Sequence, residues 1–326
     1  MRKRAVIAIV MSIALLILPV SMVFADYTSA DTQADMQSIA QNFSNLFGKN
    51  LGSISMIGDP IGYSTVPHFA VGLAAGAILV PFESIDSGTN TVYDLGGMGY
   101  APVPSIAAHM KLTVRGFELG AKVAGIPPFE LSNENFLGEV QSMVIGGKLR
   151  YRIVDKKLAV LRFGVSAGGF YDFSRGALEL TMRDSFAVYE DVTGGPEEEH
   201  IADLVSTNSF DTNWQGHTVG GEVQGNIKIL FFNLFVGGRM STSWGSADTS
   251  VNGDVSVNPV SGYEIYVTAN PTETIDIDTE SHPDGLDYYA FGGLEVKILP
   301  VVIGGRFGYN FSNDAIALDF GARLQF

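Results

Sequence analysis

The last eleven residues, Ile316-Ala-Leu-Asp-Phe-Gly-Ala-Arg-Leu-Gln-Phe326, decide the fold class of this chain. Every second residue is apolar up to the terminal Phe326, while the alternate positions include Asp319 and Arg323. A two-residue period of this kind is typical of a β-strand with two unlike faces. A soluble β-sandwich, the alternative, rarely presents a fully apolar face that runs to a free terminal Phe. The stretch therefore favours a closed β-barrel in a membrane.

The same period recurs upstream. Segments 106–115, 143–153, 218–229 and 288–298 each have one apolar face and one face that carries polar or charged residues. A tilted strand needs about ten residues to cross a bilayer, and these segments have that length. We therefore predict an all-β fold, a transmembrane antiparallel up-and-down barrel whose apolar face contacts lipid and whose polar face lines the lumen.

Short and long connections alternate along the chain, as periplasmic turns and external loops do in outer-membrane barrels. The short links are predicted at 115–116, 155–157, 230–233 and 299–300, and the long links at 81–103, 126–142, 172–214 and 246–286. The predicted strands are ten: 67–80, 104–115, 117–125, 143–154, 159–171, 215–230, 234–245, 287–299, 301–311 and 315–326. Segments 174–189 and 255–268 leave twelve or fourteen strands open. Both chain ends are placed in the periplasm.

The N-terminus predicts export. Basic residues at 2–4 precede an apolar stretch and the sequence Val23-Phe24-Ala25, which is typical of a signal peptide over 1–25 that is cleaved after Ala25. An uncleaved membrane anchor is the alternative, because the apolar stretch is long enough to span a bilayer. The expected location is the cell outer membrane. The expected organisation is a helical segment over 26–66 followed by the barrel over 67–326.

One segment has helical rather than strand periodicity. Within 31–49 the apolar residues fall three or four positions apart, at Met36, Ile39, Ala40, Phe43, Leu46 and Phe47. Such spacing predicts a short amphipathic helix whose apolar stripe must be buried. The helix is a possible plug of the lumen; it could also lie on the membrane surface or pack under the barrel.

Charge is distributed unevenly. Residues 26–326 hold 17 basic and 35 acidic residues, a net charge of −18, which excludes a general nucleic-acid binder. The predicted links 172–214 and 246–286 are acidic, whereas most basic residues fall on the polar faces of strands. The predicted lumen is therefore basic. Alternatively, the acidic links are merely solvated and the lumenal arginines pair with Glu222, Glu295 and Asp319, because narrow barrels fill their interiors with such pairs.

Nothing in the sequence indicates catalysis. There is no Cys, the five His residues are scattered, and no His, Asp and Glu have the spacing of metal ligands. Asp211 near His217 is too weak a signal for a hydrolase. We expect no enzyme activity, no cofactor and no metal.

Two resemblances add to this interpretation. The C-terminal alternation resembles the assembly signal of outer-membrane barrels, which makes Phe320, Leu324 and Phe326 the predicted contacts for the barrel-assembly machinery. A helical segment before the first strand resembles the long-chain fatty acid transport (FadL-like) family, as do Val66–Gly72 and Ala101–Ser105. That resemblance implies a hatch inside the barrel and a hydrophobic ligand.

Two functions follow. The first is passive uptake of a small hydrophobic or amphipathic solute such as a fatty acid, with its tail on an aromatic patch and its carboxylate on arginine. The predicted ligand-binding residues are Phe43, Phe47, Phe170, Phe235, Arg239, Phe291 and Arg306. The alternative is a surface-exposed barrel without transport. Such a barrel would either act as an adhesin through its acidic loops or be a structural membrane protein. Expected partners are outer-membrane lipid, the assembly machinery and that small-molecule ligand.

Overall fold

The computed structural model describes residues 67–81, 100–132, 136–190, 199–261, 273–281, 285–298 and 300–326. The predicted signal peptide and the predicted helix at 31–49 lie outside these residues. None of the described segments is a helix long and apolar enough to cross a membrane.

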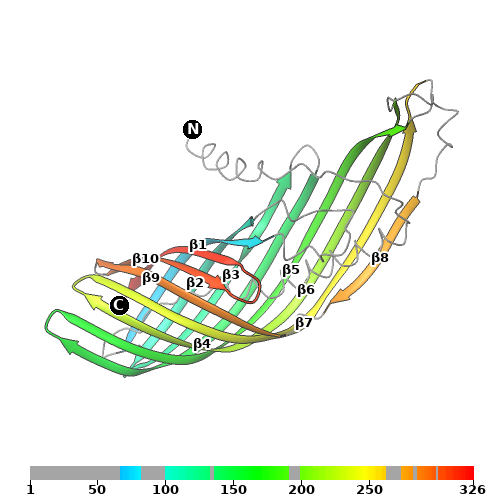
Figure 1. Cartoon of the computed structure of the whole chain (residues 1–326). Coiled ribbons are helices and arrows are strands. Elements are labelled where there is room, and N and C mark those ends of the chain that lie inside the picture. The colour runs from blue at the N-terminus through cyan, green and yellow to red at the C-terminus, as the bar shows by residue number, and fades with distance from the viewer. Residues whose placement is uncertain are drawn as a thin grey trace.

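The described residues form eleven strands joined into one antiparallel sheet (Figure 1). Their bounds are β1 (His68–Pro81), β2 (Tyr100–Val114), β3 (Phe117–Ser132), β4 (Phe136–Leu158), β5 (Leu161–Glu190), β6 (Glu199–Ile229), β7 (Phe232–Pro259), β8 (Glu273–Ser281), β9 (Leu286–Ile298), β10 (Val301–Asn310) and β11 (Ile316–Gln325). Ten of them close the barrel, which confirms the predicted strand number. The additional strand, β8, pairs with β7 beyond the point where β9 stops.

The first and last strands close the barrel. Val71 pairs with Leu324, and the pairing continues to Leu79 opposite Ile316. At its end the Phe69 amide donates to the Phe326 carbonyl at 3.1 Å, and the Phe326 amide donates back to the Phe69 carbonyl at 2.9 Å. The terminal residue thus completes the ladder that removes the free sheet edges of the barrel.

Tight turns join the strands at one end, which we call the short-turn end. The β2–β3 turn is Arg115-Gly116, with positive φ angles of 49° and 88°, a conformation typical of a two-residue hairpin. The β4–β5 turn falls at residues 159–160 rather than at the predicted 155–157, because β4 continues to Leu158. The start of β1 at His68 and the C-terminal Phe326 lie at this end.

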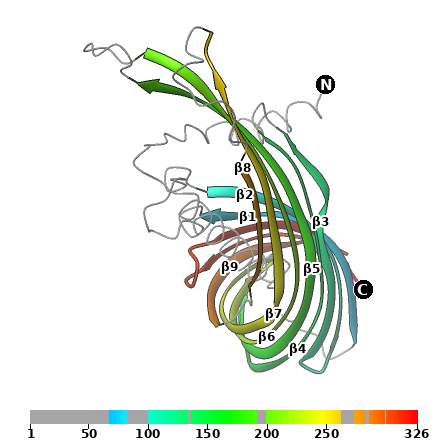
Figure 2. The same ribbon diagram turned by 90° about the vertical axis from the view of Figure 1, so that its right-hand side faces the viewer.

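The opposite end differs from the prediction. The links predicted at 126–142, 172–214 and 246–286 are wrong over most of their length, because paired strands occupy them. β5 and β6 alone have 30 and 31 residues and stay in register nearly throughout. The strands continue as one tall sheet on one side of the barrel (Figure 2). We call this sheet the raised wall; it comprises residues 126–132, 136–142, 174–190, 199–215, 246–259 and 273–281.

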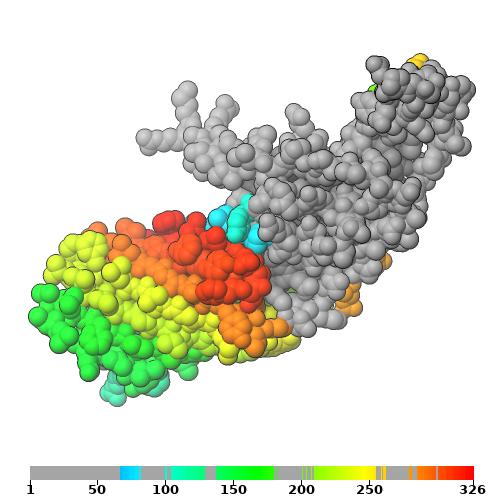
Figure 3. Space-filling view, in the orientation of Figure 1, coloured from blue at the N-terminus to red at the C-terminus, as the bar shows by residue number. Residues whose placement is uncertain are grey.

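The outside of the barrel is apolar between two belts of aromatic rings. Outward side chains such as Leu73, Ile106 and Val223 are 55 to 68% exposed. The belt near the short turns contains Phe117, Tyr151, Phe231, Phe232 and Phe326, and the belt near the raised wall contains Tyr171, Trp244, Tyr288 and Phe311. Paired aromatic girdles around an apolar band define a transmembrane barrel. Figure 3 shows β9 to β11 (orange to red) beside β7 (yellow) on this surface.

Candidate functional site: the filled lumen and its wide mouth

An arginine on β4, Arg150, links charged and polar side chains from several strands inside the lumen. The guanidinium of Arg150 is completely buried and donates to the Glu118 carboxylate on β3. It also donates to the side-chain oxygen of Gln224 on β6 at 2.9 Å, and lies 3.3 Å from a carboxylate oxygen of Glu222. Glu222 in turn accepts a hydrogen bond from Arg239 on β7 at 3.1 Å. The chain of contacts therefore joins four strands across the lumen.

Further ion pairs line the rest of the interior. Lys122 lies 2.8 Å from a carboxylate oxygen of Asp172, and Arg306 donates to Asp319. Arg323 donates to both carboxylate oxygens of Glu295, at 2.5 and 3.1 Å. Buried charges are tolerated when they are paired in this way. The structure thus confirms the alternative in which lumenal arginines pair with Glu222, Glu295 and Asp319.

Five of the seven predicted ligand-binding residues lie together on the lumen wall, and Phe43 and Phe47 lie outside the described residues. The guanidinium carbon of Arg239 is 4.2 Å from the centre of the Phe170 ring. That of Arg306 is 6.0 Å from the Phe291 ring centre, and the Phe235 and Phe291 ring centres are 6.5 Å apart. Their proximity in the lumen is therefore established, whereas their binding of a ligand stays a prediction.

These aromatic rings fill space that glycines leave on the neighbouring strand. Phe170 pairs with Gly220, and a Cβ atom at Gly220 would lie 2.6 Å from the Phe170 ring. Phe291 pairs with Gly237, where a Cβ would lie 2.5 Å from the ring. Aromatic residues over glycines are a known means of fixing strand register. Lumenal glycines opposite aromatic positions were the sequence signal that could have indicated this packing role.

Little room is left beside these rings. A cavity of about 30 Å³ lies among Phe235, Arg306 and Asp319. That volume has room for no more than a few water molecules. A fatty acid tail does not fit there without displacement of the side chains.

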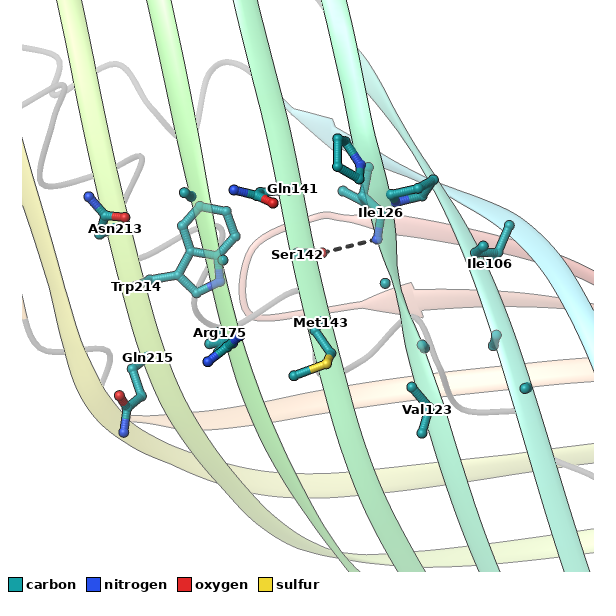
Figure 4. Close-up of a pocket in the computed structure, with 18 of the residues that line it drawn as sticks. Ile106, Val123, Ile126, Gln141, Ser142, Met143, Arg175, Asn213, Trp214 and Gln215 are labelled. Atoms are coloured by element: carbon teal, nitrogen blue, oxygen red, sulfur yellow. Dashed lines mark hydrogen bonds between the residues drawn. The ribbon is translucent and has the colours of Figure 1, made fainter.

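A much larger cavity of about 1030 Å³ lies where the barrel meets the raised wall (Figure 4). Its lining includes Ala107, Ile126, Pro127, Ser142, Gly176 and Trp214, from strands β2 to β6. Trp214 is almost fully buried, and the Ile126 amide donates to the Ser142 hydroxyl at 3.3 Å. On each strand these residues lie further from the short turns than the ion pairs do. The ion pairs therefore lie between the cavity and the short-turn end.

This cavity was not predicted from the sequence. Trp214 lies at the end of a segment predicted to be a loop, and Ile126 begins another. A single Trp flanked by alternating polar residues was the available signal, because a loop has no core in which to bury an indole ring.

The fold and its surface define the protein as an outer-membrane β-barrel. A closed antiparallel sheet satisfies its own backbone groups, and here an apolar band surrounds a polar, charged interior. The sequence of residues 29–326 matches the protein family described as Lsa36-like, so the chain belongs to that family. No curated protein matches the chain.

Solved structures with a similar fold include three outer-membrane proteins. The translocator domain of the autotransporter NalP from Neisseria meningitidis has 9% identity and a TM-score of 0.34, over 90% of this chain and 99% of that one. The outer membrane protease OmpT from Escherichia coli has 12% identity and a TM-score of 0.36, over 82% and 99%. A FadL homologue from Pseudomonas aeruginosa has 9% identity and a TM-score of 0.26, over 94% and 99%. Sequence identities and TM-scores this low assign no function to the chain.

Proposed function

We propose that this protein is a surface-exposed barrel that binds a partner through its raised wall and passes no solute through its lumen. The observation that carries the proposal is the contact chain from Glu118 through Arg150 and Glu222 to Arg239. Opening a path for a solute would separate buried charges, and leaving one such charge unpaired costs about 3–5 kcal/mol. The proposal includes no catalytic role.

The raised wall supports the binding role. It begins above the aromatic belt of Tyr171 and Trp244, where the outer face of the sheet changes from apolar to polar residues. Its residues include fourteen acidic and two basic side chains. A rigid sheet that stands outside the membrane presents its side chains at fixed spacing, which suits recognition of a macromolecule.

Uptake of a small hydrophobic solute is the second candidate. The observation in its favour is the cavity at the wide mouth, whose lining by Ile126, Pro127 and Trp214 suits an apolar ligand. This candidate corresponds to the function that the FadL-like resemblance implies. It needs a route past the ion pairs or sideways through the barrel wall.

Conductance in a planar bilayer tests the proposal. We expect no stable single-channel steps from the wild type, and small steps from the triple variant E118A/R150A/E222A, because it removes the side chains that cross the lumen. Steady conductance by the wild type would contradict the proposal. Saturable uptake of a fluorescent fatty acid into liposomes that contain the protein, above protein-free liposomes, would favour the second candidate instead.

A further inference from the structure

The raised wall has two strand edges, because the barrel below it is closed and the wall is not. Among the residues that the structure describes, β3 pairs with β2 only as far as Gly125 opposite Ile106, so residues 126–132 form one edge. β8 forms the other edge: among the described residues, β7 is the one strand that pairs with it, from Ala247–Ser281 to Val255–Glu273. A strand edge is a template on which another chain can pair.

The two edges differ in whether a further strand can add to them. The β3 edge carries Pro127 and Pro128, with a register shift between Ile126 and Phe129. Proline has no amide hydrogen, and a bulge distorts the ladder, so both features block strand addition. β8 has no proline over its nine residues and pairs with β7 without a register shift. Its outer backbone groups are therefore suited to form a second ladder.

Charge selects the kind of strand that fits. Asp278 and Glu280 on β8 are exposed, as are Asp248 and Asp254 on β7 beside them. A second copy of this chain would place its own β8 acids against them, and like charges on adjacent strands are unfavourable. A segment with lysine or arginine at alternate positions would place its cations beside Asp278 and Glu280, about 5 Å away in the pairing direction.

We propose that an extended, cationic segment of a partner protein adds to the β8 edge as a further strand. The backbone ladder supplies affinity, and the alternating cations supply selectivity. The inference rests on the proposed function, since it names the partner chemistry of the raised wall.

The test uses the full chain in lipid nanodiscs and a fluorescein-labelled ten-residue peptide with Lys at alternate positions and Thr or Val between them. We expect saturable binding, measured by fluorescence anisotropy, and a Kd raised about fivefold by D278N/E280Q, since two cross-strand charge pairs are lost. The matched control E179Q/D211N neutralises two exposed acids, Asp211 on β6 and Glu179 on β5, which lie two and three strands away from β8. We expect that control to change Kd less than about twofold, because salt screens charges at that distance.

A second peptide separates strand addition from simple charge attraction. The same sequence, N-methylated through its six central residues, keeps every cation but has no amide hydrogens there for a ladder. We expect its binding to be lost. Equal binding of both peptides, or equal weakening by the two double variants, would overturn the inference.

The other results are also decisive. No binding of the unmodified peptide, or a dimer cross-linked through T279C, would overturn the inference in favour of no partner strand or a second copy. If strand addition fails while the wild type stays non-conducting, the proposed function stands without this partner. If the wild type conducts, the proposed function fails whatever the peptide does.

Discussion

At the scale of single residues, the lumen is held by two kinds of contact, ion pairs and rings over glycines. The side chain of Phe170 illustrates both, because it packs against Gly220 and lies under the guanidinium of Arg239. A cation over a ring adds attraction to the packing. Phe170 and Arg239, both predicted from the sequence to bind a ligand, therefore contact each other in the lumen.

Replacement of Gly220 by alanine tests the packing role. The new Cβ would lie 2.5 Å from the Met240 carbonyl oxygen and 2.6 Å from the Phe170 ring, so we expect destabilisation of about 1–3 kcal/mol. Urea unfolding in lipid vesicles, followed by Trp fluorescence, measures it. Gly221→Ala is the matched control, because its Cβ would meet its nearest atom at 3.7 Å. Equal effects of the two changes would contradict this account.

The pair of Arg306 and Asp319 tests the ion pairs. Arg306→Met leaves the Asp319 carboxylate without the hydrogen bonds that Arg306 donates, and we expect a loss of about 3–5 kcal/mol in unfolding free energy. The double variant R306M/D319L removes both charges, so it should be more stable than the single variant. If the double variant unfolds at a lower urea concentration than R306M, this expectation is wrong. The Asp319 carboxylate would then stabilise the fold by more than its neutralisation of Arg306.

At the scale of elements, the β1–β11 seam depends on the last residue. Phe326 exchanges two backbone hydrogen bonds with Phe69, and its ring is exposed toward lipid. The inward positions of β1 from Ala70 to Gly76 hold only Ala or Gly, and Gly72 leaves room for His109 and Arg323. The Gly- and Ala-rich strand β1 thus pairs with β11, which carries larger inward side chains such as Arg323.

Deletion of Phe326 should prevent insertion. The deletion removes both hydrogen bonds and the terminal aromatic of the predicted assembly signal, so we expect the protein to accumulate in the periplasm. Cell fractionation measures this, and Phe326→Tyr serves as the control that keeps an aromatic ring. Normal membrane insertion of the deletion variant would sink the assembly-signal hypothesis.

At the scale of the whole molecule, the barrel is asymmetric: its wall is tall from β3 to β8 and low from β9 through β11 to β2. Among the described residues, the tall side carries the acidic excess and the proline-free β8 edge, and the strands of the low side end near the aromatic belt. Short turns face the periplasm in outer-membrane barrels, so we expect the raised wall to face outward.

Cysteine labelling tests this orientation cleanly, because the chain has no cysteine of its own. Asp254→Cys lies on the exposed face of the raised wall, and Lys157→Cys lies next to the β4–β5 turn. We expect a membrane-impermeant maleimide to label D254C on intact cells, and K157C only after permeabilisation. The reverse pattern would invert the topology.

The sequence by itself determined the class of fold, a count of ten strands with twelve or fourteen left open, and which face meets lipid in segments such as 106–115, 218–229 and 316–326. Those features follow from a local period of two residues, as in 316–326, which needs no knowledge of neighbours. It also left open the ion pairing of lumenal arginines that the structure confirms. The helix at 31–49 and the signal peptide stay predictions.

Only the tertiary structure decided the raised wall, the packing of the lumen and the cavity at its mouth. Outside the membrane neither face of a strand contacts lipid, so 174–190 and 199–215 need not alternate between apolar and polar residues. The sequence therefore favours a loop there and only leaves a strand at 174–189 open, although the two backbones pair residue by residue. The meeting of Phe170 with Gly220, or of Arg150 with Glu118 and Glu222, depends on register between strands distant in the chain. Register is set by the whole closed sheet, and no single strand encodes it.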